Sequence, residues 1–383
     1  NILLGMGCVS FKDKFLFSGA RPYEADCEDK YCVGPGDIVL ATRQQSDNLP
    51  ILAMPAIIPS SLKAKKIIYG TNLYKVENHS EVTNDFLFWQ LKTPDYIDYI
   101  SSVKTGSVVR MVTKKNVEDY VFRCPPKEVR DRISKLLWGL DRKIELNNKI
   151  NADLEEMAQA IFKNWFVDFE PFKDGKFVDS ELGMIPEGWK VGRADDFYQI
   201  NIGKTPPRKE HKWFSTNPAD KIWVSIANMG NSGIFISDSS EYLTKEAVDR
   251  HNIIMVPRNT ILLSFKLTVG RVAIADKELT TNEAIARFIL SDDKYMEYLY
   301  LYLKNFDYNS LGSTSSIATA VNSKTIKGMQ MLQPSDKIID AFHIQVNPIF
   351  EKIRSLTKEN SRLSLLRDTL LPRLMSGEIE VPE

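Results

Sequence analysis

The chain has 383 residues, 43% of them hydrophobic and 10% aromatic, which is enough for two or more folded cores. Fifty basic residues balance fifty acidic ones. This balance argues against a protein that binds nucleic acid alone and without sequence preference, since such proteins carry a basic excess. We find no apolar run long enough to cross a bilayer and no signal-peptide pattern, so we expect a cytoplasmic protein.

Cysteine and histidine are scarce, with four of each. The cysteines are Cys8, Cys27, Cys32 and Cys124, and no histidine stands at a metal-ligand spacing from them. We therefore expect free thiols, no metal site and no cofactor.

The first 126 residues are expected to form a mixed, strand-rich globular block with a net charge of +1. After Pro126, the seam residues of a predicted helix recur alternately four and three positions apart. They are Ile133, Leu137, Leu140, Ile144, Asn147, Asn151, Leu154, Ala158, Ile161 and Trp165. This spacing predicts a coiled-coil helix from about Lys127 to Phe166, and an ordinary amphipathic helix is the alternative.

The second half repeats this plan. A linker from Asp168 to Pro186 leads to a second strand-rich block, 185–334, with a net charge of +2, and a second helix lies within 335–383. The seam of this helix is Phe342, Val346, Ile349, Ile353, Leu356, Asn360, Leu363, Arg367 and Leu370. Pro334 precedes the helix and Gly377 closes it.

An internal repeat relates the two halves. Adding 209 to eight positions of the first half reaches an identical residue each time. These positions are Val112, Lys115, Pro125, Asp131, Lys143, Lys149, Asn151 and Leu154. Further upstream, 34–42 resembles 256–264 at an offset of 222, so 13 extra residues are expected in the first copy. By this alignment we expect about 37 further residues of the first block to precede Asn1.

The repeat predicts an α/β (mixed α+β) architecture of four segments, 1–126, 127–184, 185–334 and 335–383. We expect the two helices to pack antiparallel as a coiled coil, with the two blocks related by a pseudo-twofold axis. If a central asparagine pairs across the seam, the expected contact is Asn147 with Asn360. Two similar blocks suit a target in two parts.

Two motifs suggest enzymes, but neither is complete. Gly203-Lys204-Thr205 resembles the end of a phosphate loop, yet Tyr198 stands where the motif needs glycine, and prolines 206 and 207 prevent the required helix. Neither 217–220 nor 347–350 matches the Asn/Asp-Pro-Pro-aromatic motif with which an adenine methyltransferase grips a flipped base. A standalone enzyme is therefore disfavoured.

Loops rich in basic, amide and hydroxyl side chains are candidates for DNA contact, with a plain surface role as the alternative. Arginine reads guanine, glutamine reads adenine, and small hydroxyls bind phosphates or base edges. In the first block the candidates are Arg43, Gln44, Gln45, Lys104, Thr105, Ser107, Arg110 and Lys114. In the second block they are Lys204, Thr205, Arg208, Lys266, Thr268, Arg271, Ser313, Thr314, Ser315, Ser316 and Thr319.

The stretch 150–172, INADLEEMAQAIFKNWFVDFEPF, resembles the central helix of type I restriction-modification specificity subunits. Residues 182–190, LGMIPEGWK, are similar to that family's entry into its second target-recognition domain. Weaker similarity follows in 203–206, 222–224, 270–274 and 281–285. The second helix ends in Leu-Met-Ser-Gly instead of the Trp-Phe-Val-Asp-Phe tail of the first, a stop that is common in this family.

The resemblance implies a non-catalytic subunit that reads a split sequence in double-stranded DNA, one half per block. It implies two modification (methyltransferase) subunits and restriction subunits as partners, and no membrane. A coiled-coil scaffold that ignores DNA is the alternative function.

Overall fold

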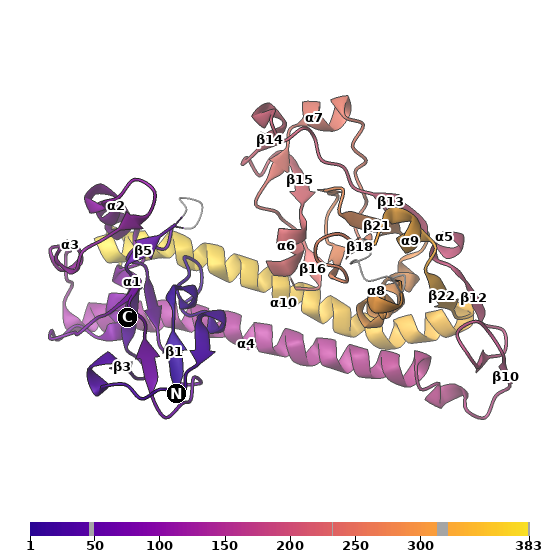
Figure 1. Cartoon of the computed structure of the whole chain (residues 1–383), viewed down its shortest axis with the longest axis horizontal. Helices are drawn as coiled ribbons and strands as arrows, with labels where there is room; N and C mark the ends of the chain where they lie inside the picture. Colours follow the sequence, from indigo (N-terminus) through magenta and orange to yellow (C-terminus); the bar gives the residue numbers. More distant parts are fainter. Residues whose placement is uncertain (46–49, 232, 312–320, 382–383) are drawn as a thin grey trace. The chain divides into compact units, whose positions relative to one another are not determined.

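A computed structural model describes residues 1–45, 50–231, 233–311 and 321–381. The chain divides into two compact units, Asn1–Glu145 with Ser361–Glu383, and Leu146–Asn360. Two long helices, α4 (Lys127–Phe166) and α10 (Asp336–Ser376), contribute residues to both units (Figure 1, magenta and yellow). The bounds of α4 are those expected from the heptad spacing.

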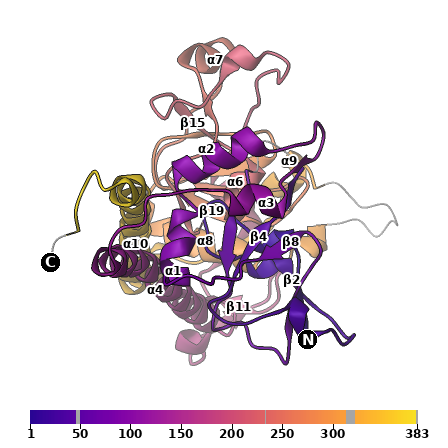
Figure 2. The same cartoon turned by 90° about the vertical axis from the view of Figure 1, so that its left-hand side faces the viewer.

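The first unit contains three small sheets, ordered β2-β1-β7-β3, β6-β4-β8 and β5-β9. Its helices α1, α2 and α3 and strands β4 and β8 are labelled in Figure 2. The strands are β1 (Ile2–Leu4), β2 (Ala20–Pro22), β3 (Cys32–Val33), β4 (Ile38–Ala41), β5 (Arg43–Gln44), β6 (Pro55–Ile57), β7 (Ile67–Tyr69), β8 (Leu73–Lys75) and β9 (Arg110–Met111). The short helices are α1 (Asn84–Gln90), α2 (Pro94–Val103) and α3 (Lys114–Glu118).

The second unit is built around a five-stranded sheet, β13-β21-β18-β19-β16. A four-stranded sheet, β14-β17-β15-β20, and the pairs β12-β22 and β10-β11 complete its strand pairing. The strands are β10 (Phe177–Val178), β11 (Ile185–Pro186), β12 (Lys190–Arg193), β13 (Gln199–Ile202), β14 (Phe214–Ser215), β15 (Lys221–Val224), β16 (Phe235–Ile236), β17 (Tyr242–Leu243), β18 (Ile261–Ser264), β19 (Val272–Ala275), β20 (Thr280–Thr281), β21 (Ile285–Ile289) and β22 (Gln330–Gln333). The short helices are α5 (Ala194–Phe197), α6 (Ile226–Asn231), α7 (Lys245–Arg250), α8 (Met296–Asn305) and α9 (Ser323–Lys327).

The same three-stranded core occurs in both units. The central strands β4 and β18 are buried at every residue, as expected for continuous apolar runs covered on both faces. Each pairs antiparallel with two neighbours, β6 and β8 in the first unit and β19 and β21 in the second. The repeat seen in the sequence is therefore a repeat of fold.

Helix bounds confirm the offset of 209. Helix α3 begins at Lys114 and α9 at Ser323, and α4 begins at Lys127 and α10 at Asp336, so both differences are 209. The helix caps follow the same spacing, since Thr113 caps α3 and Asn322 caps α9.

The upstream offset of 222 is wrong by one residue. The turn before β4 places Gly36 in the left-handed region (φ 85°), and the turn before β18 places Asn259 there (φ 67°). Because glycine and asparagine tolerate this conformation best, the two turns align at 259 − 36 = 223. The first copy thus carries 223 − 209 = 14 extra residues between the matching stretches. Six of them lie in the connection between β4 and β6, which has 13 residues (42–54) against 7 (265–271) between β18 and β19.

The helices pack antiparallel within each unit. In the second unit, Nδ2 of Asn147 donates to Oδ1 of Asn360 at 2.9 Å, while Phe162 and Phe166 near the end of α4 contact Phe342 near the start of α10. The expected contact between Asn147 and Asn360 is confirmed. An amide pair in an apolar seam favours one register over others, because a slipped register would bury an amide without its partner.

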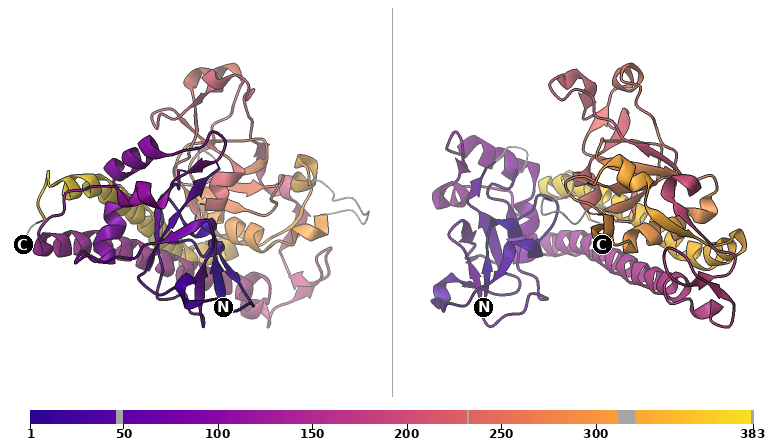
Figure 3. Two further views of the ribbon diagram at one scale, coloured as in Figure 1. Left: turned by 60° about the vertical axis from the view of Figure 1, so that its left-hand side comes forward. Right: turned by 45° about the vertical axis from the view of Figure 1, so that its right-hand side comes forward.

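In the first unit the two helices also pack antiparallel. Arg367 of α10 donates from Nη1 to Oδ1 of Asp141 in α4 at 2.6 Å. Ile133 and Leu137 share a core with Leu371. The two helices lie side by side in both views of Figure 3, as these contacts require. Every predicted seam residue is buried or half-buried, and Gly377 ends α10 with a φ of 76°.

In each unit, ion pairs join the block to one of the long helices. The helix residues involved, Glu145 and Arg354, occupy equivalent positions of the repeat. In the second unit the buried Asp276 lies 3.1 Å from Nε of Arg354 and 3.3 Å from Nζ of Lys358, both on α10. In the first unit Lys14 lies 2.5 Å from Oε1 of Glu145 on α4. Since 145 + 209 = 354, the two helices use equivalent positions with opposite charges.

Glu297 of α8 is fully buried against α10. Its Oε1 accepts a hydrogen bond from Nδ2 of Asn347 at 2.9 Å, and its Oε2 lies 2.8 Å from Nδ1 of His343. Burial raises the pKa of Glu297 above its ordinary value of 4.5, and the two hydrogen bonds only partly oppose this. The folded state therefore holds the proton more tightly than the unfolded chain does.

We predict a pH-dependent effect of Glu297→Gln on stability. As pH rises from 4.5 through the raised pKa, the wild type loses stability because its buried carboxyl must ionise, whereas the amide does not. The melting temperature of the variant minus that of the wild type should therefore increase with pH across this window. Thermal unfolding at several pH values measures this difference, with Glu278→Gln on the exposed surface as the control. A difference independent of pH would contradict the prediction.

Candidate nucleic-acid interface

The first unit brings most of its predicted contact residues into one ribbon. Strands β5 and β9 pair antiparallel, with Arg43 opposite Met111 and Gln44 opposite Arg110. Thr105 and Met111 exchange two backbone hydrogen bonds of 2.9 Å and close a hairpin that includes Ser107. Residues 43–44 and 105–110, far apart in sequence, are thus neighbours.

The side chains of this ribbon differ in their exposure to solvent and in whether they are already hydrogen-bonded within the protein. Arg43, Gln45, Thr105 and Ser107 are exposed, and Lys104 is half-buried. Gln44 is buried, and its Oε1 accepts a hydrogen bond from the backbone N–H of Leu52 at 3.2 Å. It holds the long connection between β4 and β6, so a base contact would require it to break this bond.

The turn of the Thr105–Met111 hairpin depends on Gly106. Its φ is +90°, and a Cβ at this position would lie 2.1 Å from the carbonyl oxygen of Val109. Nη1 of Arg110 donates to the carbonyl oxygen of Gly106 at 2.5 Å, which ties the arginine to the turn. Lys114, the last candidate in this unit, is exposed at the start of α3, with its Nζ 5.7 Å from the centre of the Tyr74 ring.

In the second unit the hairpin of β18 and β19 carries three candidates. Lys266 and Thr268 are exposed, whereas Arg271 is half-buried. Nη1 of Arg271 donates to the carbonyl oxygen of Ile226 at 2.8 Å, and its guanidinium fills the space where a Cβ on Gly230 would stand. Arg271 therefore fastens α6 to the hairpin.

The candidates at 204–208 are occupied by contacts within the second unit. Nζ of Lys204 donates to the carbonyl oxygen of His251 at 2.5 Å, and the hydroxyl of Thr205 donates to Glu283. Arg208 forms two hydrogen bonds to Glu241, of 2.8 and 3.1 Å. Its guanidinium also lies over the rings of Phe214 and Trp223, at 4.3 and 4.5 Å. No helix follows Gly203-Lys204-Thr205 before residue 211, in agreement with the rejection of a phosphate loop.

The hydroxyl-rich loop of the second block lies outside the described residues. Its candidates are Ser313, Thr314, Ser315, Ser316 and Thr319.

Two residues that support the second hairpin were not among the site residues predicted from the sequence. Ser264 is buried, and its Oγ donates to the carbonyl oxygen of Thr268 at 2.5 Å and accepts the backbone N–H of Arg271 at 3.0 Å. Gly230 leaves room for Arg271. A serine that ends an apolar strand was a signal for the first, but nothing local marked the second.

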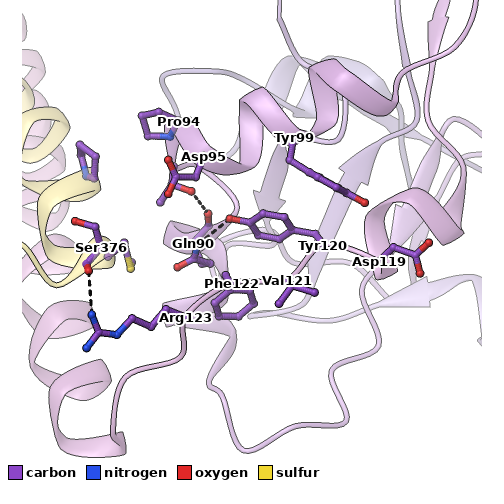
Figure 4. Close-up of a pocket in the computed structure, with 13 residues that line it drawn as sticks. Gln90, Pro94, Asp95, Tyr99, Asp119, Tyr120, Val121, Phe122, Arg123 and Ser376 are labelled. Atoms are coloured by element: carbon purple, nitrogen blue, oxygen red, sulfur yellow. Dashed lines mark hydrogen bonds between the residues drawn. The ribbon is translucent and has the colours of Figure 1, made fainter.

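A hollow of about 490 Å³ lies in the first unit beside Tyr120–Arg123 (Figure 4). Nε2 of Gln90 donates to the hydroxyl of Tyr120 at 3.1 Å, and Nη1 of Arg123 donates to the carbonyl oxygen of Ser376 at 3.4 Å. Its lining is mixed, with tyrosine, serine, threonine and aspartate side chains beside prolines and Phe122. In the second unit the equivalent residues, at +209, form β22 and pair with β12; among the described residues no strand pairs with 121–124.

The four cysteines are free, as expected, and burial raises the pKa of the Cys8 thiol to about 12. Over 1–45, 50–231, 233–311 and 321–381, no group of three or more His, Cys, Asp or Glu side chains is placed to hold a metal ion. In the same ranges no helix combines the length and apolar character that a membrane crossing needs.

Two copies of one strand core, each with an exposed hairpin of basic and hydroxyl residues and each packed on a pair of antiparallel helices, make this a duplicated, two-unit protein. The family model for the type I restriction modification DNA specificity domain matches this chain twice, over residues 21–156 and 186–343. The chain therefore belongs to the type I restriction-modification specificity subunits, which recognise DNA sequence.

The chain is also similar to individual proteins. The chain is 29% identical over 377 residues to the type I restriction enzyme HindI specificity subunit of Haemophilus influenzae, covering 82% of this chain and 81% of the relative. It is 29% identical over 312 residues to the MjaIX specificity subunit of Methanocaldococcus jannaschii, covering 79% and 70%. A crystal structure of a type I S subunit from M. genitalium aligns with a TM-score of 0.49 at 13% identity, over 91% of this chain and 84% of that one.

We predict that Gln44→Ala and Lys266→Ala act on different properties. The first leaves the buried N–H of Leu52 without its acceptor and should lower the free energy of unfolding by about 1–3 kcal/mol. The second removes an exposed cation and should change it by no more than about 0.5 kcal/mol. Urea unfolding of both variants measures this contrast. Equal destabilisation by the two substitutions would contradict these assignments.

Proposed function

We propose that the chain is a non-catalytic reader of a DNA target in two parts, with blocks 1–126 and 185–334 each reading one half. The observation that carries this proposal is the repeated core, since β4 and β18 each lead into a hairpin connection with exposed basic or polar side chains. Such side chains suit contacts with phosphates and base edges. Arg43, Gln45, Thr105 and Ser107, and Lys266 and Thr268, are the contact residues that the geometry supports best.

The proposed partners are double-stranded DNA, two modification (methyltransferase) subunits and restriction subunits, in the cytoplasm. The charge balance supports a need for protein partners, because fifty acidic residues offset the fifty basic ones. Much of the phosphate neutralisation then has to come from the other subunits. The incomplete enzyme motifs are consistent with chemistry carried by those subunits.

DNA binding tests this proposal directly. The chain alone should bind duplex DNA weakly and with little preference. The complex with modification subunits should bind a duplex that contains the sequence it methylates more tightly than a scrambled duplex. Gel-shift titration at physiological salt measures both affinities, with the modification subunits alone as the control. Equal binding of the two duplexes by the complete complex would favour the coiled-coil scaffold instead.

A block exchange tests the assignment of one half-site to each block. Replacing residues 185–334 with the matching block of a relative should change one half of the methylated sequence and leave the other half unchanged. The incoming block must keep a carboxylate at the position of Asp276, since Arg354 on α10 is buried against it. Mapping of methylated bases gives the readout, and the reciprocal exchange of 1–126 is the matched control. A change in both halves would contradict the assignment.

A further inference from the structure

We propose that Leu267, at the tip of the hairpin between β18 and β19, is an apolar wedge that inserts between stacked bases of the target. This inference rests on the proposed DNA-reading function and names a specificity-determining residue within it. Strand β18 is labelled in Figure 1 and strand β19 in Figure 2.

Leu267 stands out by its exposure. Leu267 is 98% exposed, the highest value among the large hydrophobic side chains that the structure leaves exposed in its described residues. Single exposed apolar residues are common on protein surfaces and by themselves need no explanation. Leu267 differs from such residues because a strained backbone turn holds it at the tip of the hairpin.

The backbone at Leu267 is strained. Leu267 has a φ of +62°, and the N–H of Thr268 donates to the carbonyl oxygen of Lys266 at 2.7 Å. This bond spans two residues and makes a γ-turn with positive φ, which is rare and unfavourable for a side chain branched beyond Cβ. Strained conformations persist where surrounding structure enforces them, and they concentrate at sites of binding or catalysis.

Hydrogen bonds and close packing support the turn that carries Leu267. Oγ of the buried Ser264 donates to the carbonyl oxygen of Thr268 at 2.5 Å, and the N–H of Gly270 donates to the carbonyl oxygen of Ser264 at 3.0 Å. A Cβ on Gly270 would lie 3.0 Å from the ring of Tyr308, so the base of the turn packs closely. The leucine therefore projects from a rigid base, and little conformational freedom remains to be lost on binding.

The first unit also has an exposed aliphatic side chain at a hairpin tip. Val108, at the tip of the Thr105–Met111 hairpin, is 84% exposed and follows the positive-φ Gly106. A lysine stands beside each tip, with Lys266 exposed next to Leu267 and Lys104 half-buried at the start of the other hairpin. Proteins that unstack or kink DNA use this combination, because cations hold the phosphates while the apolar group enters a base step.

The test uses the complex with its modification subunits and duplexes that carry 2-aminopurine at successive positions of each half-site. The wild type should raise 2-aminopurine fluorescence at one base step of the half-site read by residues 185–334. Leu267→Ala should abolish that signal and weaken binding to the target about tenfold. The dependence of affinity on salt should not change, because no charge is removed.

Three further variants keep the result interpretable. Leu267→Gly removes the side chain but relieves the positive φ, so it should fold at least as stably as the wild type and still lose the signal. Val108→Ala should remove a signal in the other half-site only. Leu182→Ala, an exposed leucine elsewhere in the second unit, should change nothing.

Three outcomes would overturn the inference. Two of them refute only the wedge, and the third also refutes the proposed function. If the wild type prefers its target but Leu267→Ala keeps the same fluorescence and affinity, the wedge is refuted and the reading function stands. The wedge is also refuted if affinity falls without any fluorescence signal in the wild type, since the leucine then touches bases without unstacking them. If the wild-type complex does not discriminate target from scrambled DNA, the proposed function fails as well.

Discussion

The amide contact between Asn147 and Asn360 is the constraint on which the second unit depends. Both residues lie in a seam that is otherwise largely apolar, where an unpartnered amide would cost about 1–3 kcal/mol. The pair therefore favours one alignment of α4 against α10. That alignment brings Phe342 against Phe162 and Phe166, and it places Arg354 where Asp276 can reach it.

The ion pairs between blocks and helices explain how a duplicated protein keeps its copies distinct. Glu145 and Arg354 occupy the same repeat position, yet the first meets Lys14 of its block and the second meets Asp276 of the other. Exchanging the partners would place like charges together, and for Asp276 it would leave a buried carboxylate without its cations. Charge reversal at one position thus directs each block to its own helix.

In the region that reads DNA in the proposed function, the two copies differ in loop length. Their central strands and flanking pairs agree, but the hairpin connection has 13 residues in one copy and 7 in the other. Several side chains predicted to contact DNA also make contacts within the fold. Gln44 accepts a hydrogen bond from a backbone N–H, and Arg208 bonds to Glu241 and lies over two aromatic rings. A rigid core with variable, internally braced loops allows the loops to change without loss of the fold.

The sequence by itself determined the repeat, the bounds of α4, the antiparallel seam and the family, because periodicity and residue type along one chain carry that information. It misplaced the upstream alignment by one residue, since the left-handed turn at Gly36 and Asn259 is a backbone property and the residue types on either side align equally well. Only the tertiary structure decided which candidate side chains reach solvent. Burial and hydrogen bonding at Gln44, Lys204 and Arg271 depend on backbone groups up to 47 residues away in sequence, and no local pattern encodes those contacts.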